Sequence, residues 1–405
     1  MKIMQIDVNY DHSSTGMIVK DLQFGLEAKG HQVLVCFGRE VAGLKSAAIR
    51  IAPKWEVYAH AALTRLTGWT GNFSPVATRK CIEYIEAFKP DVVHLHELHG
   101  YFINYRVLIE YLKRKGMPVV WTFHCEFMYT GKCGYSYDCE RWKAECGNCP
   151  QVTSYPASLY FDKTHEMLQQ KKKMFTDFDR LKIIAPSKWL ADRVRQSLLN
   201  SKDIGVIYNG IDVENTFTPQ PTEALRKELG IKTKHVLVSI APDLMSERKG
   251  GKWILQLAAR LVQDDVTLVM VGVDNPEVVS APNTIVLPRL GDKQELAKYY
   301  SLGDFFLLTS KKETFSLVCA ESLACGTPII GFDAGAPTEV APPGYGLFVE
   351  YGNLDQLQAA VLDALHRRIK FRSGPECTDY AFGMFGKKKM VQSYIAEYEE
   401  LVCRV

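Results

Sequence analysis

The chain has 405 residues, a formal net charge of +3, a hydrophobic fraction of 47% and a charged fraction of 23%. These values are typical of a globular protein and, at roughly 150 residues per domain, predict two or three domains. So small a net charge argues against a protein that coats nucleic acid. No apolar run approaches the roughly 18 residues of a membrane-spanning helix. Residues 1–10 include Asp7, so we interpret them as a core strand rather than a signal peptide and expect a cytoplasmic protein.

Short apolar runs typical of strands alternate along the chain with stretches of helical spacing. In the first half we expect strands at residues 2–8, 32–37, 91–95, 118–123, 182–185 and 205–208, and helices at 16–29, 78–88, 104–114 and 188–199. In the second half we expect strands at 236–240, 267–273, 283–287, 305–308 and 328–332, and helices at 251–262, 293–302, 316–324 and 383–402. This alternation predicts an α/β protein with doubly wound parallel sheets.

The break in this alternation predicts the domain boundaries. The first domain is expected to cover residues 1–212, with a Cys-rich insert at 125–150, and a Pro-containing linker follows at 213–234. The second domain is expected at 235–375, and residues 376–405 should form a terminal helix that packs back on the first domain. Ligands of such sheets bind at the carboxyl ends of the strands, so we expect the site in the cleft between the two domains.

Three signatures that are frequent in doubly wound folds do not occur in the sequence. These are the G-x-G-x-x-G dinucleotide motif, the G-x-x-x-x-G-K-[ST] phosphate loop and the G-x-S-x-G nucleophile elbow. Their absence argues against a dehydrogenase, a P-loop NTPase and an α/β-hydrolase.

The loops of the second domain carry two motifs suited to a nucleotide. Glu313 follows an expected strand and Glu321 lies within the next helix. A helix start offers backbone N–H groups and a positive dipole end to a phosphate, and carboxylates accept hydrogen bonds from ribose and sugar hydroxyl groups. Arg248 and Lys249 stand directly before a helix that opens with glycine, and such a pair suits a pyrophosphate. Spacing alone also fits solvent-exposed charge in both places.

Together these motifs resemble a known family. The E-x7-E pair, the R-K-G turn, the N-G-I-D stretch at 209–212 and the G-A-P-T-E loop at 335–339 resemble retaining glycosyltransferases of the GT-B fold, family four. The D-V-V-H-L-H and W-T-F-H segments and the cysteines behind them resemble colanic-acid-type exopolysaccharide glycosyltransferases in particular. The resemblance covers nearly the whole chain. It implies two facing Rossmann-like domains with a C-terminal crossover helix.

The resemblance also implies an activity and a set of site residues. A hexosyl group would pass from a UDP- or GDP-sugar to a saccharide acceptor, expected to be lipid-linked, with retention of anomeric configuration. Glu321 would hold the donor ribose, Glu313 would contact the donor sugar, and Arg248 and Lys249 would neutralise the diphosphate. Glu313, Lys249 and His124 would be the catalytic residues, and catalysis would need no cofactor. The other donor-binding residues implied are Gly16, Thr314, Phe315, Ser316 and Leu317.

The chain has 11 cysteines, an odd number that argues against a disulfide framework. Four of them cluster at Cys133, Cys139, Cys146 and Cys149. Four thiolates can close a tetrahedral shell, and the C-x2-C pair is a usual half-site for zinc. We predict a structural zinc ion here and leave unliganded thiols, disulfides and an iron–sulfur cluster as alternatives.

Lys171, Lys172 and Lys173, with Phe175 and Phe178 nearby, form a basic and aromatic stretch. A helix that exposed it would rest on an anionic inner membrane, and a solvated face explains the same pattern. Two other functions fit the scaffold: a nucleotide-sugar 2-epimerase and a non-catalytic sugar-binding protein. The sequence identifies neither the base and sugar of the donor nor the acceptor.

Overall fold

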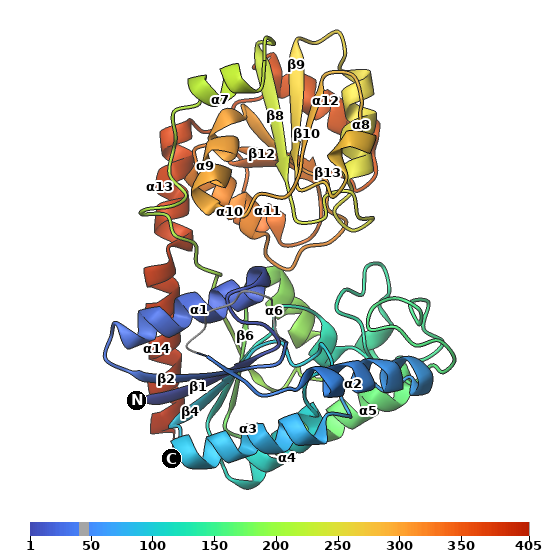
Figure 1. Ribbon diagram of the computed structural model, residues 1–405, viewed down its shortest axis with the longest axis vertical. Coiled ribbons are helices and arrows are strands. Elements are labelled where there is room, and N and C mark those ends of the chain that lie inside the picture. Colours follow the sequence, from blue (N-terminus) through green and yellow to red (C-terminus); the bar gives the residue numbers. More distant parts are fainter. Residues whose placement is uncertain (40–47, 405) are drawn as a thin grey trace. The chain divides into compact units, whose positions relative to one another are not determined.

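The computed structural model describes residues 1–39 and 48–404. It consists of two compact units, the first formed by Met1–Tyr208 with Met390–Val405 and the second by Asn209–Lys389 (Figure 1). Each unit is built on one parallel sheet with helices packed on its faces, so the prediction of two doubly wound α/β domains is confirmed.

Unit 1 contains a seven-stranded parallel sheet in the order β3-β2-β1-β4-β5-β6-β7. The strands are β1 (Lys2–Asp7), β2 (Gln32–Phe37), β3 (Ile49–Arg50), β4 (Val92–Leu95), β5 (Val119–Thr122), β6 (Leu181–Ala185) and β7 (Asp203–Val206). The central strands are buried on both faces, which is why they read as continuous apolar runs in the sequence. All expected strands of this half are present, with small shifts at their ends.

Helices surround the sheet of unit 1. They are α1 (Ser13–Glu27), α2 (Lys54–Thr67), α3 (Pro75–Phe88), α4 (Tyr105–Arg114), α5 (Thr164–Phe175), α6 (Lys188–Arg195) and the greater part of α14 (Lys387–Cys403). The sequence analysis missed α2 and α5. Two short 3₁₀ helices, η1 (Phe127–Tyr129) and η2 (Arg141–Lys143), lie in the long segment between β5 and α5.

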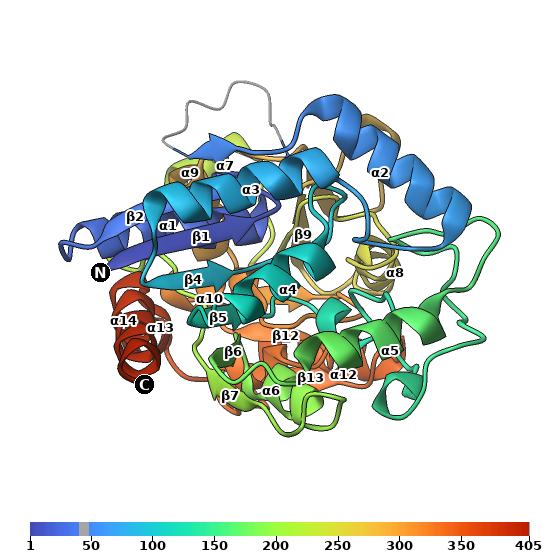
Figure 2. The same cartoon turned by 90° about the horizontal axis from the view of Figure 1, so that it is seen from below.

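The face of this sheet under α14 carries a polar network. His94 on β4 is fully buried, with Nε2 2.8 Å from Thr122 Oγ1 and Nδ1 2.6 Å from the Tyr398 hydroxyl. The Tyr394 hydroxyl is 2.8 Å from the same Thr122 oxygen, and Lys182 is 3.2 Å from Glu397. These bonds attach the C-terminal helix to the sheet of unit 1 (Figure 2).

Unit 2 contains a six-stranded parallel sheet in the order β10-β9-β8-β11-β12-β13. The strands are β8 (His235–Ile240), β9 (Val266–Val271), β10 (Thr284–Leu287), β11 (Phe305–Leu308), β12 (Ile329–Phe332) and β13 (Gly346–Val349). The helices are α7 (Glu223–Glu228), α8 (Gly251–Arg260), η3 (Pro276–Val278), α9 (Lys293–Leu302), α10 (Leu317–Ala324), α11 (Pro337–Val340), α12 (Leu354–Leu365) and α13 (Gly374–Phe385). Apolar side chains of β8, β9 and β11 pack with α8 and α12 to form the core on one face.

The prediction of one last helix at residues 383–402 is wrong, because the structure has two helices there, α13 and α14. The Gly374-Pro375 pair starts a helix instead of breaking one. Ser373 forms a capping box with Glu376, and Pro375 lies in the first turn, where its missing N–H has no cost. Gly386, with φ −65° and ψ 132°, then separates the two helices.

The prediction of a basic and aromatic surface at residues 171–178 is also wrong. Lys171 is fully buried, and Phe175 and Phe178 are only 2% and 3% exposed. The three residues share the inward face of α5 and the turn behind it, while Lys172 and Lys173 point outward. Within the described residues, no helix combines the length and the apolar character needed to cross a membrane.

A buried histidine makes the stability of unit 1 depend on pH. His60 of α2 has Nδ1 2.7 Å from Ser74 Oγ, and its Nε2 accepts the Gly71 N–H at 3.2 Å. Burial lowers the pKa of His60 to about 4, below its ordinary value of 6.5. The unfolded chain therefore binds a proton between pH 6.5 and 4 that the folded chain does not, so stability falls as the pH falls through this window.

We expect His60→Gln to lose less stability in acid than the wild type. The free energy of unfolding that the wild type loses between pH 7 and pH 4 should shrink by at most about 3 kcal/mol in the variant. Urea unfolding of both proteins at a series of pH values measures it. The matched control is His366→Gln, which changes an exposed histidine. Equal pH dependence in the wild type and His60→Gln would contradict the prediction.

Candidate active site

The expected donor-binding residues lie where the strand order of unit 2 reverses. The chain winds outward from β8 to β9 and β10, then returns to β11 on the other side of β8. The loops that follow β8 and β11 therefore diverge, and an opening between such loops is the usual ligand site of doubly wound sheets. Arg248 and Lys249 lie on the loop after β8, and Glu313 lies on the loop after β11.

Lys249 and Glu313 form a nearly buried ion pair. The Nζ atom is 2.6 Å from Glu313 Oε1, and the two side chains are 11% and 10% exposed. Arg248 Nη1 lies 3.6 Å from the same oxygen. Burial raises the pKa of Glu313, but Lys249 and then Arg248 outweigh burial and hold this pKa below its ordinary value. The result is a charged cluster with two cations and one anion.

Backbone contacts fix the two diverging loops to each other. Thr309 Oγ1 donates to the Lys249 carbonyl oxygen at 3.0 Å, and the Lys311 N–H donates to the Arg248 carbonyl oxygen at 2.8 Å. Gly250 has a φ of +72°, and a Cβ atom there would lie 2.3 Å from the Thr309 carbonyl oxygen. Only glycine permits this approach, which places the basic pair against the loop of Glu313.

The small-residue loop after β12 holds Glu313 from the other side. The Glu313 N–H donates to the Ala334 carbonyl oxygen at 2.9 Å, and the Ala336 N–H donates to the Glu313 carbonyl oxygen at 3.3 Å. Glu313 and Gly335 form an isolated parallel bridge. Three loops at the carboxyl edge of one sheet therefore meet at Glu313.

The segment from Thr314 to Leu317 leads from Glu313 into α10. Thr314, Phe315 and Ser316 are buried, and the Phe315 ring packs edge-on against Phe385 at 5.7 Å. Ser316 caps the helix with a left-handed backbone, φ 86° and ψ 83°, which a residue with a side chain rarely adopts. This strained residue turns the chain sharply into α10.

Glu321 lies one turn into α10 and has a partner that the sequence analysis missed. The Tyr300 hydroxyl of α9 donates to Glu321 Oε2 at 2.7 Å. Burial raises the pKa of Glu321, and the hydrogen bond from Tyr300 opposes the rise. No spacing rule links these residues, because they lie on different helices.

The candidate residues of unit 1 lie near the corresponding reversal, which falls between β1 and β4: Gly16 follows β1, and His124 follows β5, the strand next to β4. His124 follows β5, and its Nε2 is 3.1 Å from Nδ1 of His96, with the two rings stacked. Burial lowers the pKa of His124 to about 4, so the imidazole is neutral near pH 7. Gly16 lies in the first turn of α1, where a Cβ atom would lie 3.1 Å from the Tyr10 nitrogen.

Four further residues lie at this edge, Asp7, Glu97, His99 and Cys125, and the sequence assigned none of them a role in the site. Burial and then Glu97 raise the pKa of Asp7 to about 7. His99 Nε2 is 3.0 Å from Glu97 Oε2 and 3.5 Å from Cys125 Sγ, and the three ligand atoms lie within 4.8 Å of one another. The ion pair and hydrogen bond already satisfy these atoms, so their arrangement requires no metal ion.

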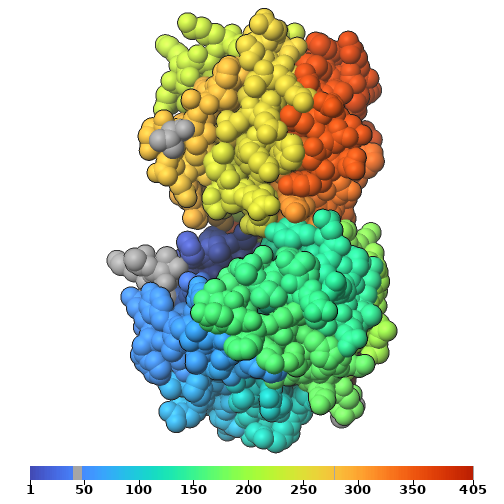
Figure 3. All heavy atoms as spheres, turned by 90° about the vertical axis from the view of Figure 1, so that its right-hand side faces the viewer, coloured from blue at the N-terminus to red at the C-terminus, as the bar shows by residue number. Residues whose placement is uncertain are grey.

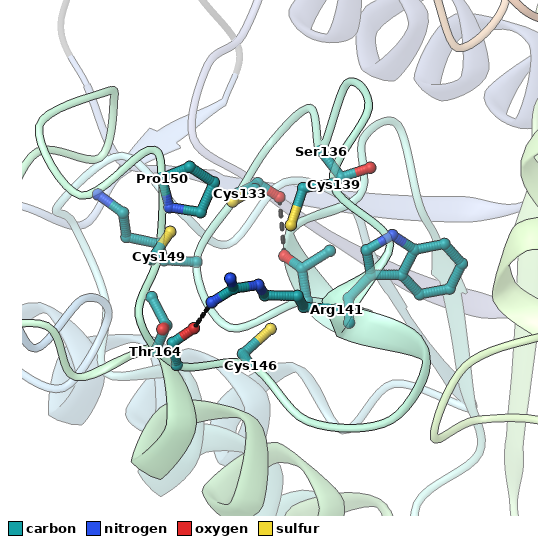
Figure 4. A pocket seen from close by; sticks show the side chains of 12 residues that line it. Cys133, Ser136, Cys139, Arg141, Cys146, Cys149, Pro150 and Thr164 are labelled. Atoms are coloured by element: carbon teal, nitrogen blue, oxygen red, sulfur yellow. Dashed lines mark hydrogen bonds between the residues drawn. The ribbon is translucent and has the colours of Figure 1, made fainter.

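The structure brings the four clustered cysteines together as well. Cys133, Cys139, Cys146 and Cys149 all line one pocket in the segment between β5 and α5 (Figure 4).

Two family models match the chain. Residues 15–215 match the model described as Glycosyltransferase Family 4, and residues 234–367 match the model described as Glycosyl transferases group 1. The reversal of the unit 2 sheet, between β8 and β11, falls within the second match.

Similar proteins span the whole chain. WcaC of Escherichia coli (strain K12), named as a colanic acid biosynthesis glycosyl transferase, is 24% identical over 99% of this chain and 100% of its own length. Sucrose-phosphate synthase from Thermosynechococcus elongatus has a TM-score of 0.73 at 16% identity, with full coverage of both chains. HepE of Anabaena in complex with UDP-glucose has a TM-score of 0.66 at 15% identity, covering 99% of this chain and 100% of HepE.

The two parallel sheets, the matched domains and the similar structures define a glycosyltransferase with the GT-B fold. Within that class, the chain carries a family 4 domain followed by a group 1 domain.

The buried ion pair predicts a cost for neutralising Glu313. In Glu313→Gln, Lys249 keeps its charge in a nearly buried position and loses its anion, which destabilises unit 2 by about 3 kcal/mol. Thermal or urea unfolding measures the change. The matched control Glu350→Gln, at an exposed position of the same unit, should leave stability unchanged. A Glu313→Gln protein as stable as the control would show that the pair is not maintained in solution.

Proposed function

We propose that this glycosyltransferase moves a hexosyl group from a nucleotide-sugar donor to a hydroxyl group of a saccharide acceptor, with retention of anomeric configuration. The observation that carries the proposal is the cluster of Arg248, Lys249 and Glu313 at the strand-order reversal of unit 2. Two cations fixed by backbone bonds suit a diphosphate. The complexes of HepE with UDP and with UDP-glucose support a nucleotide-sugar donor.

The proposed roles follow from charge and position. Arg248 and Lys249 bind the diphosphate, and Glu321 accepts hydrogen bonds from the ribose. Glu313 accepts a hydrogen bond from the donor sugar while it holds Lys249 in place. Because the Phe315 side chain is buried, the segment from Thr314 to Leu317 contributes backbone N–H groups at the start of α10.

In unit 1, Gly16 would allow the first loop to approach the phosphates. The neutral imidazole of His124 would hydrogen bond the sugar that is transferred. Gly16 follows β1 at the strand-order reversal, and His124 contacts His96, which follows β4 on the other side of that reversal, where ligands of such folds are bound.

The proposed reaction is a displacement on one face of the sugar. The bond between the anomeric carbon and the diphosphate oxygen breaks, and negative charge grows on the leaving phosphate. Lys249 and Arg248 stabilise this growing charge more than the ground state, which is what lowers a barrier. The acceptor oxygen bonds to the anomeric carbon, and its proton passes to the leaving phosphate. No metal ion is required in this scheme.

We expect Lys249→Ala to lower kcat/KM by about 100-fold or more, because it removes one of two cations from the leaving phosphate. Lys252→Ala, on the exposed side of α8, is the matched control and should retain activity. Thermal shift with a panel of UDP-, GDP- and ADP-sugars selects the donor for this assay. Full activity of Lys249→Ala would contradict the proposed diphosphate site.

The same assay tests the class of reaction. NMR of the product should give the anomeric configuration of the donor, and the inverted product would contradict retention. Epimerisation of the donor sugar in the absence of an acceptor would instead identify a nucleotide-sugar 2-epimerase. Binding of a sugar without turnover of any donor would identify a sugar-binding protein.

We further propose that the reaction belongs to the synthesis of a bacterial exopolysaccharide or other surface polysaccharide. The full-length similarity to WcaC, named for colanic acid biosynthesis, supports this placement. We also propose that the growing polymer is attached to a lipid carrier. The acceptor would then be a lipid-linked saccharide.

A surface of unit 1 supports a lipid-linked acceptor. Helix α2 buries polar side chains and exposes apolar ones. The buried polar residues are Glu56, His60 and Thr64. Its exposed large apolar side chains are Trp55, Tyr58, Leu63 and Leu66, from 40% to 72% exposed. The Leu159 N–H donates to the Arg65 carbonyl oxygen at 2.9 Å, which brings the exposed Leu159, Tyr160 and Phe161 to the end of this helix. Figure 3 shows blue and green segments of unit 1 next to each other on one face.

The charge of this surface complements an anionic bilayer. Lys54 and Arg65 are exposed on α2, whereas the carboxylate of Glu56 is buried and accepts the Val76 and Ala77 N–H groups at 2.8 and 2.9 Å. Exposed Trp and Tyr with flanking basic residues are typical of helices that lie in the membrane interface. We therefore propose peripheral contact with an anionic membrane through α2 and the loop from Leu159 to Phe161.

We expect the protein to float with vesicles that contain phosphatidylglycerol, and the variant Trp55→Ser/Tyr58→Ser to stay in the soluble fraction. Phe24→Ser, an exposed aromatic change on α1, is the matched control and should still float. Flotation should weaken at high salt, because part of the attraction is electrostatic. Absence of flotation at low salt would remove the membrane proposal without affecting the transferase proposal.

A further inference from the structure

The segment between β5 and α5 carries four thiols but little regular structure. Within its described residues, only η1 and η2 are helical, and most of its side chains from Lys143 to Tyr155 are partly or fully exposed. Cys133, Cys139, Cys146 and Cys149 nevertheless all point toward one pocket, shown in Figure 4. A loop-rich segment with so small a core needs another source of order.

A backbone N–H group reaches one of the sulfur atoms. The Gly131 N–H donates to Cys146 Sγ at 3.3 Å. Backbone N–H donors to sulfur are the outer contacts that orient and stabilise thiolate ligands of a metal.

Two buried lysines flank the same pocket. Lys171 is fully buried, and its Nζ donates to the carbonyl oxygens of Phe127, Thr130 and Gly131. Lys132 is 2% exposed, and its Nζ donates to the carbonyl oxygens of Val152, Ser154 and Pro156. Carbonyl dipoles only partly replace the hydration of a buried ammonium group, so nearby negative charge is required.

Lys132 lines the same pocket as the four cysteines, and Lys171 donates to the carbonyl oxygen of Thr130, which also lines it. Thiolates in this pocket would supply the negative charge that the two lysines need. A divalent cation with four thiolates carries a net charge of −2, which two ammonium groups offset. The Arg141 guanidinium, which lies among the thiols in Figure 4 and is bound to the Gly147 and Asn148 carbonyl oxygens, adds to the positive surroundings.

We propose that Cys133, Cys139, Cys146 and Cys149 bind one zinc ion in a tetrahedral shell. Four sulfur ligands and the C-x2-C pair favour zinc over harder divalent ions. Binding draws the sulfur atoms to about 3.8 Å from one another, given zinc–sulfur bonds of about 2.3 Å, and moves the Arg141 side chain aside.

The zinc ion is structural and lies outside the transfer reaction. Four protein ligands leave no open coordination position for a substrate. The ion ties the loop that holds Glu126 to the loop before α5, where Asp162 accepts the Cys149 N–H at 2.7 Å. Glu126 in turn pairs with Arg193 of α6 at 2.7 Å, so the metal links the insert to the body of unit 1.

Metal analysis of the purified full-length protein tests the proposal. We expect one zinc per chain in the wild type, the same in Cys403→Ser, which removes an exposed cysteine elsewhere, and none in Cys146→Ser/Cys149→Ser. A wild type that lacks zinc after purification in zinc-supplemented buffer would overturn the site. So would zinc that persists in the double variant.

A second measurement covers the case in which the double variant fails to fold. In the native wild type, alkylation followed by peptide mass spectrometry should leave these four cysteines unmodified until a chelator is added. Replacement of zinc by cobalt should give the visible absorption of a tetrahedral cobalt–thiolate site. Four reactive thiols before chelation, disulfide-linked peptides, or iron with sulfide-type absorption would each contradict the zinc site.

Discussion

Parallel strand pairing is the constraint on which the rest of this molecule depends. Because all strands of a parallel sheet run the same way, all their carboxyl ends lie along one edge. In each unit the chain winds outward from a central strand and then returns to its other side. The loops at that reversal diverge. Lys249 and Glu313 lie on these loops in unit 2. In unit 1, His96 follows β4 at the reversal and contacts His124 on the next loop.

This constraint also decides what the sequence could predict. Strands buried on both faces are continuous apolar runs, so the sheets, the helices between most of them and the loops that carry the charged residues were predicted from the sequence. The pairing of Lys249 with Glu313, 64 residues apart, was not, because only the folded loops bring them together. The hydrogen bond from Tyr300 to Glu321 and the electrostatic interaction between Asp7 and Glu97 could not be predicted for the same reason.

Two other failures, the missed helix α2 and the basic surface expected on α5, share a different cause, which is burial of polar residues. Helix α2 places Glu56, His60 and Thr64 inward, so its hydrophobic pattern is the inverse of an ordinary surface helix. Lys171 sits at helical spacing with Phe175 and belongs to the inner face of α5, although lysine is rarely buried. Each case depends on partners from distant segments that satisfy the polar atoms, such as the carbonyl oxygens around Lys171. A prediction based only on the polarity of each residue cannot identify such partners.

The course of the C-terminal helix has a consequence for the order in which the molecule is made. Unit 1 includes Met390–Val405, which follow unit 2 in the sequence, and these carry the tyrosines that bond His94 and Thr122. Unit 2 lies between the two parts of unit 1 in the sequence. During synthesis, the later half of the protein can therefore be complete while the earlier half still lacks a helix and leaves buried imidazole and hydroxyl groups open to water. The sheet that is translated before unit 2 therefore receives its last helix only after unit 2 has been translated.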